Sequence, residues 1–537
     1  MAQLLRYVLS PQLYSIISKP DYYTPNFLED SGNITLRIIA ILKSLTMYSS
    51  PIILLFIQRN GYYKKNHAYV YLKITFILFC ILTFGNLLRG AGRLLNSEYL
   101  NFLKLYDIYQ RSKDAHERTA FLKMYDFDTR SWNPDYVITE KPDIKSHFSR
   151  KDESDEEYRG TLPNWKRIPF NILSYLATHS FALKMAYPGY TSIMNFLLGN
   201  SLIDGRYNLL TRHKGQRAKI RVYNGEDVDT MFIDKRGNPA KTMGEYLMIV
   251  CEGNASYYEV GCLHSFLDTG LSLLSWNHPG FGASTGEPFP QTELTFIDGV
   301  VKYALNVLKF QESKLIFYSW SIGCFSASWA SMRYHGNKAL ILDAAFDDIL
   351  PLAINRMPTA IENLVTFTIR KYIDLRTLQF LIKNPSKNII FIRRTQDEIM
   401  NMIDGDVSSN RINNLVLKIF KYRYPHVFTS DVLCAVRSVL CNQTDSQNAV
   451  TSTVYKGSFS TLTPDLAQLN GNLYSIGEFP SPLGTDLRKE QKLDFALDLV
   501  RKYLFDYQGS HCEPIPKHFY INIISKLLEP ESLQTAI

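Results

Sequence analysis

The clearest pattern in this chain is a series of short apolar runs separated by helix-length segments, and it begins near residue 217. Residues 218–223 and 228–234 alternate between apolar and polar positions, as the strands of a hairpin do. Helix-length segments lie between the apolar runs that come next, notably at 292–308 and 321–334. Five later runs are almost continuously apolar: 246–251, 271–276, 315–318, 339–342 and 389–392. Buried strands separated by helices predict an α/β fold with a mostly parallel central sheet flanked by helices.

Two longer apolar stretches come before this region, at residues 38–57 and 68–88. A membrane-spanning helix needs roughly 20 predominantly apolar residues, and each stretch reaches that length if its one lysine, Lys43 or Lys73, extends toward the headgroups. The pattern predicts an N-terminal transmembrane hairpin. Two buried core helices, or one span with an interfacial segment, would give the same pattern. Basic residues lie both between and after the two stretches, so the positive-inside rule does not decide the orientation.

These patterns divide the chain into three predicted parts. Residues 1–95 form a membrane-anchoring segment, residues 96–165 a charged linker, and residues 166–537 the α/β domain. A segment at 168–203 is again apolar and aromatic. It predicts one or two amphipathic helices that lie on a membrane, cap a pocket or pack on the core of the domain itself.

The predicted linker contains an acid-rich run and one match to a catalytic motif. Residues 152–158 form an acid-rich run, and His147 and Asp152 match an H-x-x-x-x-D acyltransferase pattern. Both lie in a charged, loop-like stretch, where a rigid catalytic pair is not expected. We therefore assign neither to catalysis.

Composition narrows the choice of partners. The net charge of +8 is modest for 537 residues and no dense basic stripe is present, which argues against nucleic-acid binding and favours an anionic lipid surface. The seven cysteines show no C-x-x-C pair and no Cys/His cluster with zinc spacing. They predict reduced thiols in a cytosol-facing domain. We expect neither a metal nor an organic cofactor.

The strongest chemical motif is the sequence Ser319-Trp320-Ser321-Ile322-Gly323. An apolar run leads into it, and a helix-compatible stretch rich in small residues follows. A strand, a sharp turn with a central serine and a helix make up a nucleophile elbow, which holds the hydroxyl clear of the backbone. Ser319 stands where the usual motif has glycine. Ser321 is the predicted nucleophile.

The turn after residues 246–251 is a candidate for part of an oxyanion hole. It contains Asn254 and Ala255, and either backbone N–H is a candidate donor beside that of Ile322. Asn254 also begins a glycosylation sequon. Because a sugar there would block the pocket, this again favours a cytosolic domain.

The loop after residues 271–276 reads HPGFG. We expect His278, Gly280 and Phe281 to shape the wall of a substrate pocket, together with Trp320 of the elbow. His278 comes before the serine in the chain, and proline and glycines follow it. It is therefore expected in a structural turn and not as the catalytic base.

The triad acid is expected after a strand that follows the elbow helix. Asp397, directly after the run at 389–392, has that position and would orient the base histidine. Asp343, at the end of the preceding strand, is the runner-up, and Asp347 and Asp348 are further candidates.

The base must follow the acid in this fold, and three histidines do. His511 lies in a glycine-flanked loop after a helical run and is the predicted base. His518 is the fallback, and His426 lies in a helix-like run. The long gap between Asp397 and His511 predicts a largely helical cap insertion at 401–482, which could act as a lid.

Several stretches together resemble the α/β-hydrolase domain-containing protein 16 family of membrane-bound phosphatidylserine lipases. They are CEGNASYYEVGC (251–262), NHPGFGASTG (277–286), WSIGCF (320–325), LDAAFDDILPL (342–352), IRRTQDEI (392–399), YRYPH (422–426) and HCEPIP (511–516). One departure is Cys324, where the family often has a second glycine. The resemblance implies Ser321 as nucleophile, Asp397 as acid and His511 as base.

The resemblance also implies a substrate. It implies cleavage of an acyl ester of phosphatidylserine to lysophosphatidylserine and a fatty acid, with monoacylglycerol as a further substrate. We expect an integral membrane protein of the endoplasmic reticulum with its hydrolase domain in the cytosol. Two other functions fit the same motifs: an acyltransferase that uses the same acyl-serine, and a non-catalytic membrane scaffold with a hydrolase fold.

Overall fold

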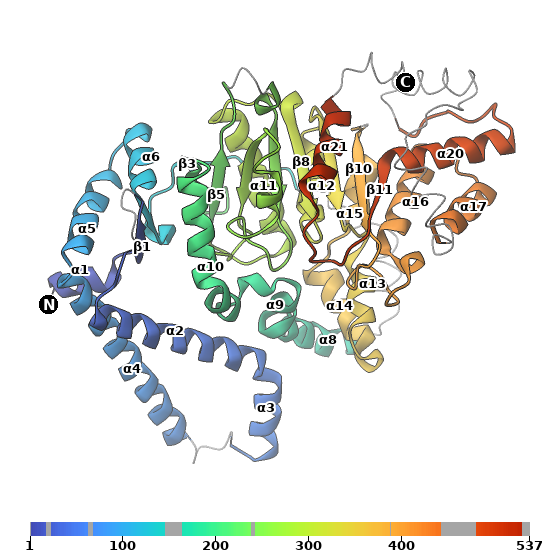
Figure 1. The fold of residues 1–537 in the computed structure, drawn as a ribbon. Coiled ribbons are helices and arrows are strands. Elements are labelled where there is room, and N and C mark those ends of the chain that lie inside the picture. The colour runs from blue at the N-terminus through green and yellow to red at the C-terminus, as the bar shows by residue number, and fades with distance from the viewer. Residues whose placement is uncertain are drawn as a thin grey trace.

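The centre of the molecule is a nine-stranded sheet in the order β11-β10-β9-β8-β6-β7-β5-β4-β3 (Figure 1). A computed structural model describes residues 2–17, 23–62, 68–144, 164–237, 242–386, 388–441 and 479–528. The strand bounds are β3 Tyr136–Val137, β4 Gln216–Arg221, β5 Asp227–Ile233, β6 Leu247–Cys251, β7 Ser272–Trp276, β8 Leu315–Trp320, β9 Ala339–Asp343, β10 Ile389–Arg394 and β11 Leu504–Tyr507. Strands β6 to β11 run parallel, whereas β5 is antiparallel to both β4 and β7. All seven predicted strands are present. The short strands β3 and β11 were not predicted.

Both faces of the sheet are covered, as continuous apolar strands require. Along β6, Leu247 and Ile249 pack in one hydrophobic cluster, whereas Met248 and Val250 pack in the other. This is the two-residue period of a strand that is buried on both sides. The first cluster includes α11 (Pro290–Asn306) and α12 (Gly323–Arg333), and the second includes α21 (Lys517–Leu528). The predicted parallel sheet flanked by helices is confirmed.

The strand order reverses around β6, which lies between β7 and β8. The chain passes from β6 to β7 on one side and then returns to β8 on the other. In open α/β sheets the ligand site lies beyond the carboxyl ends of the strands at such a reversal. Two short helices, α13 (Ile349–Asn355) and α14 (Glu362–Tyr372), follow β9 at this edge of the sheet (Figure 1).

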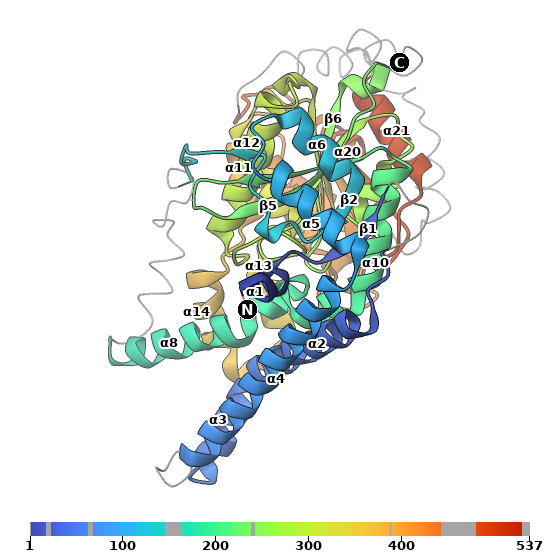
Figure 2. The same ribbon diagram turned by 90° about the vertical axis from the view of Figure 1, so that its left-hand side faces the viewer.

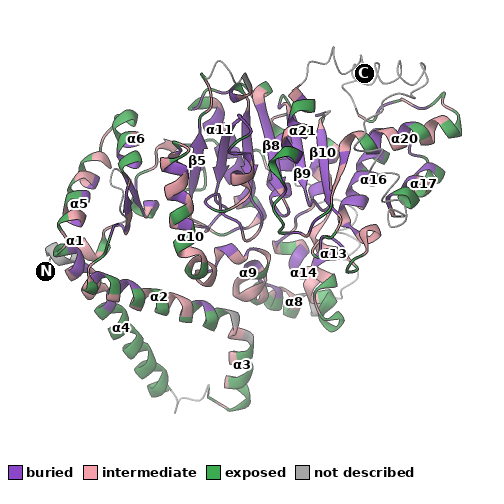
Figure 3. Cartoon of the chain, in the orientation of Figure 1, coloured by how far each residue is buried: buried purple, intermediate pink, exposed green. Residues whose placement is uncertain are grey.

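The N-terminal apolar stretches form helices that project away from the sheet (Figure 2). The second stretch lies in α4 (Ala68–Leu94), which is long and apolar enough to cross a membrane. It is exposed along most of its length (Figure 3). The first stretch is divided between α2 (Phe27–Tyr48) and α3 (Ser50–Arg59), which are bent by 70°. Pro51 lies in the first turn of α3, and proline has no backbone N–H to donate in a continuous helix. Among the described residues there is therefore one straight candidate span, and a second only if the bent pair is taken as one.

The prediction of a charged linker at 96–165 is wrong for its first half. Helices α5 (Ser97–Tyr109) and α6 (Ala115–Met124) and strand β2 (Tyr125–Phe127) enclose a separate core. Strand β1 (Leu13–Ile16) pairs with β2. The core consists mainly of aromatic side chains, among them Tyr99, Phe102, Tyr106, Phe121, Phe127 and Trp132. The charged residues that suggested a linker lie mostly on the outer faces of these helices. Residues 145–163, which include His147, Asp152 and the acid-rich run, lie outside the described residues.

The amphipathic segment forms a helical layer. Its first part lies beside the carboxyl edge of the sheet, and its last helix runs alongside the sheet next to β5 (Figure 1). It comprises α8 (Asn164–Ala177), a π-helical turn η3 (Thr178–Ala182), α9 (Leu183–Ala186), the short η4 (Pro188–Tyr190) and α10 (Ser192–Thr211). Helix α8 contacts α14, and α10 contacts α2 of the N-terminal segment.

The described part of the predicted cap insertion is helical. Helix α16 (Arg411–Arg423) packs against β10 and α15 (Thr377–Lys383), and α17 (Ser430–Cys441) packs against α20 (Lys489–Tyr503). These helices flank the β10–β11 end of the sheet (Figure 1). Residues 442–478 of the insertion lie outside the described residues, so its role as a lid stays a prediction.

Candidate active site

Ser321 occupies a strained turn between β8 and α12. Its φ angle of 56° lies in the left-handed region, which costs a non-glycine residue about 1–3 kcal/mol and marks functional turns. Its backbone N–H donates to the carbonyl oxygen of Asp343 at 2.9 Å, which holds the turn in place. A Cβ atom on Gly323 would lie 2.6 Å from the carbonyl oxygen of Cys251, so a larger residue would not fit. This is the geometry of the predicted elbow.

The first position of the elbow tolerates serine. Ser319 is fully buried, and its hydroxyl contacts the thiol of Cys324 at 3.3 Å and the carbonyl oxygen of Ile341 at 3.4 Å. The two departures from the usual glycines, Ser319 and Cys324, therefore contact each other beneath the turn. Their effect is on packing, and neither side chain contacts Ser321 Oγ.

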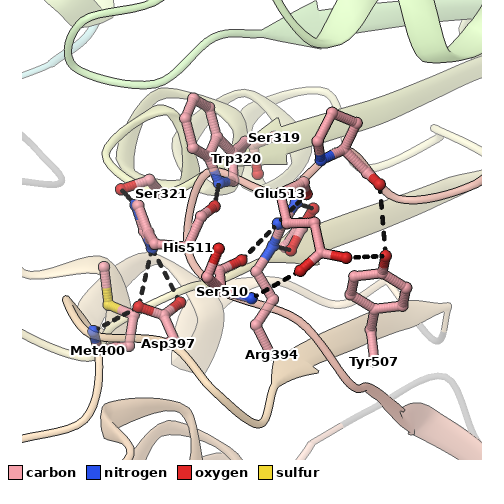
Figure 4. A network of polar contacts seen from close by, with 12 residues as sticks. Ser319, Trp320, Ser321, Arg394, Asp397, Met400, Tyr507, Ser510, His511 and Glu513 are labelled. Carbon is pink, nitrogen blue, oxygen red and sulfur yellow. Dashed lines mark hydrogen bonds and ion pairs between the residues drawn. The ribbon is translucent and has the colours of Figure 1, made fainter. Parts of the chain in front are cut away.

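Asp397, His511 and Ser321 form a continuous hydrogen-bonded relay (Figure 4). His511 Nδ1 lies 2.8 and 2.9 Å from the two carboxylate oxygens of Asp397. His511 Nε2 lies 3.0 Å from Ser321 Oγ. All three residues are buried, with Ser321 5% and His511 4% exposed. The three predicted residues thus meet, although 114 positions separate Asp397 from His511.

The turn that follows β10 orients the carboxylate of Asp397. The backbone N–H groups of Ile399 and Met400 donate to Asp397 Oδ1 at 2.9 and 2.8 Å. These two hydrogen bonds restrict the rotation of the carboxylate. An ionised carboxylate at Nδ1 directs the basic lone pair of the imidazole to Nε2, which faces the serine.

The loop that carries His511 is held by its backbone. The Arg394 guanidinium donates to the carbonyl oxygens of Ser510 and Glu513 at 3.0 and 2.6 Å. The N–H of His511 donates to the Glu398 carboxylate at 3.0 Å. The indole N–H of Trp320 donates to the carbonyl oxygen of His511 at 3.2 Å. Three elements therefore fix the position of this loop.

Asp343, the runner-up for the triad acid, is part of this support. Its carboxylate pairs with Arg394 through two hydrogen bonds of 2.8 and 2.9 Å and also accepts from the hydroxyls of Tyr318 and Tyr520. Burial acts to lower the pKa of Arg394, but Asp343 outweighs it and raises that pKa above its usual value. Asp343 is thus a structural partner of Arg394 and not the acid that contacts a histidine.

Asp347 and Asp348, the two further candidates for the acid, bind basic side chains instead of a histidine. The carboxylate of Asp347 binds Arg411 and Lys418, and that of Asp348 caps α13 and binds Arg370. The two remaining histidines that follow the acid in the chain, His426 and His518, are both exposed.

Trp320 lies between the base and the turn after β6. Its ring lies over the His511 ring, with centroids 5.2 Å apart and planes inclined by 34°. A Cβ atom on Gly253 would lie 2.5 Å from Trp320 Cε3, so this turn packs directly on the indole. Ile322 is the N-cap of α12, where backbone N–H groups have no carbonyl partner from a preceding turn. The N–H groups of Ile322 and of Asn254 or Ala255 are therefore available as oxyanion donors, a role that stays a prediction.

The loop after β7 contacts the turn after β6 through a hydrogen bond. His278 is buried and contacts the Glu293 carboxylate through Nδ1 at 2.9 Å, while Nε2–H donates to the carbonyl oxygen of Glu252 at 2.9 Å. Burial acts to lower the pKa of His278, but the charge of Glu293 outweighs it and the net shift is upward. His278 therefore has a structural position, as its place before the serine indicated.

Gly280 and Phe281 pack against the helical layer. Gly280 has a φ of 77°, and a Cβ atom there would lie 2.3 Å from the Tyr190 ring. Phe281 is fully buried among aromatic rings that include Tyr187 and Tyr257. Their predicted role as pocket wall remains a prediction.

Sequence reasoning missed the supporting groups. Glu252, Glu293, Arg394 and Glu398 were not assigned roles, yet each binds a residue or loop of the site. For Glu252, Arg394 and Glu398 the available signal was a charged residue at the end of, or just after, a buried apolar strand, whereas Glu293 lies in α11 and gave no such signal. Such a residue must find a partner at the carboxyl edge.

Three features define this protein as an α/β-hydrolase. They are a mostly parallel sheet with its switch point at β6, a strained serine between β8 and α12, and a relay in the chain order Ser, Asp, His.

Comparison with known proteins then gives the family. Residues 2–128 match the family model described as the phosphatidylserine lipase ABHD16 N-terminal domain. The chain is 35% identical to the phosphatidylserine lipase ABHD16A of Rattus norvegicus, over 97% of this chain and 99% of the relative. It is 34% identical to the protein of the same name from Homo sapiens, over 96% and 98% of the two chains. The chain belongs to the ABHD16 family.

Solved structures are similar over a smaller part of the chain. An α/β-hydrolase from Vibrio vulnificus is 15% identical, with a TM-score of 0.30, and covers 44% of this chain and 78% of its own. An esterase from Pyrococcus furiosus is 11% identical, with a TM-score of 0.29, over 39% and 77% of the two chains.

Proposed function

We propose that this protein is a membrane-anchored serine lipase that cleaves an acyl ester of phosphatidylserine to lysophosphatidylserine and a fatty acid. The observation that carries the proposal is the relay of Ser321, His511 and Asp397 in a chain that is similar along nearly its whole length to phosphatidylserine lipases. Monoacylglycerol, a smaller ester of the same kind, is a second proposed substrate.

In the proposed reaction, His511 Nε2 takes the proton of Ser321 Oγ as the oxygen attacks the ester carbonyl carbon. Asp397 stabilises the imidazolium that forms. The ester C–O bond then breaks, and the lysolipid leaves with the proton from His511. A water molecule, deprotonated by the same nitrogen, attacks the acyl-serine carbonyl. The bond from the acyl carbon to Ser321 Oγ then breaks, His511 returns the proton to Oγ, and the fatty acid leaves. No metal or organic cofactor takes part in these steps.

The negative charge on the carbonyl oxygen needs donors that are already in place. The backbone N–H of Ile322 is the proposed first donor, and that of Asn254 or Ala255 the second. Each such donor is worth about 2.7–4 kcal/mol of transition-state stabilisation. The direct packing of Gly253 on Trp320 supports this assignment, because it brings the turn after β6 next to the elbow.

The proposed anchor is α4, alone or with the bent α2–α3 pair. We propose a location in the endoplasmic reticulum membrane with residues 166–537 in the cytosol. All seven cysteines are free, which fits a reducing compartment. We also propose that residues 401–482 form a lid, because their first helix, α16, starts beside the turn that carries Asp397.

A fluorophosphonate probe and lipid profiling test the proposal. The wild-type protein in membranes should be labelled, and Ser321→Ala should not. Ser328→Ala is the matched control, because its buried hydroxyl on α12 has no hydrogen-bond partner among the described residues, and it should label like wild type. Cells that express wild type should gain lysophosphatidylserine relative to Ser321→Ala. No labelling of wild type would instead support a non-catalytic scaffold.

Product analysis separates hydrolysis from acyl transfer. With a lysolipid or alcohol present as acceptor, a lipase releases mainly free fatty acid, whereas an acyltransferase forms a new ester at its expense. Transfer as the main outcome would replace the lipase assignment while leaving the acyl-serine step intact.

A further inference from the structure

One face of helix α8 is apolar and uncovered. Ile168, Ile172, Leu173, Tyr175 and Leu176 are between 48% and 68% exposed, although they follow one another within nine positions. Monomeric soluble proteins rarely leave a contiguous apolar patch of this kind open to water. The face continues onto the next helices through a few more exposed side chains: Met185, Phe196 and Leu197.

After its first four residues, α8 carries no formal charge. From residue 168 to residue 183 there is no Asp, Glu, Lys or Arg. The first cation after it, Lys184, is turned inward, since its amine donates to the carbonyl oxygens of His179 and Ser180 at 3.0 and 2.8 Å. An uncharged aliphatic surface with a tyrosine suits the boundary between headgroups and acyl chains.

The inner side of this helical layer contacts the active-site loops. The backbone N–H of Gly189 donates to the carbonyl oxygen of Asn254 at 3.4 Å, and the hydroxyl of Tyr257 donates to the carbonyl oxygen of Gly189 at 2.6 Å. A Cβ atom on Gly189 would lie 2.1 Å from the Phe281 ring. The layer is therefore packed on the proposed oxyanion turn on one side and exposes apolar side chains on the other.

The candidate membrane helices lie at the same side of the molecule. In Figures 1 and 2, α8 and the α2–α4 helices both lie below the sheet, beside its carboxyl edge. Helix α2 contacts both α10 and η3, so the layer adjoins the membrane segment directly. Helix α8 is also fixed to α14 by the ring pair Phe170–Phe367 and by the hydrogen bond from Lys371 Nζ to Asn171 Oδ1.

We propose that α8, with the adjoining exposed side chains of α9 and α10, lies in the bilayer surface and seats the carboxyl edge of the sheet on the membrane. The occupant of the apolar face is the lipid bilayer, because the helical layer adjoins α2, which packs against the membrane-length apolar helix α4. A long-chain ester then reaches Ser321 from the bilayer side. This last step rests on the proposed function for the identity of the substrate, whereas the bilayer contact does not.

Fluorescence quenching tests the contact without any use of catalysis. The full chain is reconstituted in phosphatidylcholine–phosphatidylserine vesicles whose phosphatidylcholine is brominated near the upper part of its acyl chains. One variant carries Leu173→Trp, on the apolar face. The control carries Val307→Trp, which is 43% exposed and follows α11 at the opposite, amino edge of the sheet. The emission of wild type, with five tryptophans, is subtracted from each.

We expect the bromine to quench at least half of the signal added by Leu173→Trp and to leave that of Val307→Trp unchanged. Equal quenching of the two, or none of either, overturns the proposal. A blue-shifted Leu173→Trp signal that bromine does not quench also overturns it, because a second protein surface would then cover the face.

Kinetics test the route of the substrate. Ile172→Gln combined with Leu176→Gln makes the face polar while keeping good helix formers. Val307→Gln combined with Val137→Gln is the control, with two exposed valines outside both the helical layer and the proposed lid. On phosphatidylserine in vesicles the α8 variant should lose about tenfold in activity, and on a water-soluble short-chain ester it should stay within twofold of wild type. The control should keep both activities.

A loss on both substrates, or on neither, overturns the proposed route. The proposed function fails in a different way. If wild type hydrolyses no ester of any kind, the lipase assignment is wrong, while the quenching result still decides the bilayer contact.

Discussion

The described part of the chain contains two buried histidine–carboxylate pairs, which have similar contacts at Nδ1 and different contacts at Nε2. His511 Nδ1 lies 2.8 Å from Asp397, and His278 Nδ1 lies 2.9 Å from Glu293. Each histidine is less than 5% exposed. At Nε2, however, His511 faces the hydroxyl of Ser321, whereas His278 faces the carbonyl oxygen of Glu252.

The difference shows what makes a histidine a base. A carbonyl oxygen can only accept, so His278 must keep a proton on Nε2 and has no lone pair for catalysis. The serine hydroxyl can donate, so His511 can take its proton. Both histidines thus share a carboxylate partner, burial and a place in the site, and only the group opposite Nε2 separates His511, the proposed base, from His278.

The largest expected effect comes from removing the charge of each carboxylate in turn. Asp397→Asn should lower kcat by about 10⁴-fold, because it favours the wrong tautomer of His511. Glu293→Gln should lower kcat less than tenfold, since His278 takes no proton in the reaction. Ester hydrolysis and fluorophosphonate labelling rates measure both. An equal loss of kcat in the two variants would contradict different roles for the two histidine–carboxylate pairs.

The second-largest effect on kcat is expected from the loop that carries His511. No comparable arginine-supported loop carries His278 in the described part of the chain. Arg394→Met should lower kcat by about 10- to 100-fold with little change in KM, because the carbonyls of Ser510 and Glu513 lose their donor. It should also cost about 3 kcal/mol in unfolding free energy, since Asp343 is left buried and unpaired.

Arg393→Met is the matched control for that variant. Arg393 is fully buried and pairs with Asp506 through two hydrogen bonds of 2.7 and 2.8 Å. The control should lose stability while kcat stays within threefold of wild type. If kcat falls equally in both variants, the loss reports general destabilisation and not the position of His511.

A smaller effect on activity, with a clear effect on stability, is expected at the structural histidine. His278→Gln should cost about 3 kcal/mol, because it leaves the buried Glu293 carboxylate without a cation. It should lower kcat about tenfold, since the carbonyl of Glu252 loses its donor beside the oxyanion turn. His511→Gln should show the reverse: it should abolish activity but lower the unfolding free energy by less than about 1 kcal/mol, because Asp397 keeps two backbone donors. Thermal unfolding in detergent and ester hydrolysis separate the two.

The smallest effect is a pH dependence of stability. The pKa of folded His278 is raised above its ordinary value of 6.5, against the effect of burial, by Glu293. A raised pKa in the folded state means that the pair contributes fully below about pH 6.5 and loses its contribution as pH rises through the folded pKa. The melting temperature of wild type should therefore exceed that of Glu293→Gln by more at pH 6 than at pH 9. A margin that widens with pH would contradict this.

Much of the site could be predicted because local sequence carries it. The strand ends, the small residue at Gly323 and the loop around His511 are all local features, and they led to Ser321, Asp397 and His511, which the structure brings together. Chain order then removed His278 from the candidates for the base, and its contact with Glu252 agrees with that.

The N-terminal third shows where local patterns fail. The aromatic residues Phe102, Phe121 and Trp132 are spread among charged residues, so the average over residues 96–165 was that of a linker. They form a core only when two helices and a short β-pair bring them together. Strand β11 was missed for a similar reason, because four residues after a long helix become a strand only by pairing with β10.

The sequence by itself determined the α/β pattern, the elbow at Ser321 and the chain order of acid and base, since strand periodicity and turn chemistry depend on neighbouring residues. Only the tertiary structure decided which of the several aspartates and histidines meet. Asp343 and Asp397 both follow buried strands, yet Arg394 takes the first and His511 the second. Partner choice among buried charges depends on distances between segments that lie up to 190 positions apart, and these distances are set by packing of the whole sheet.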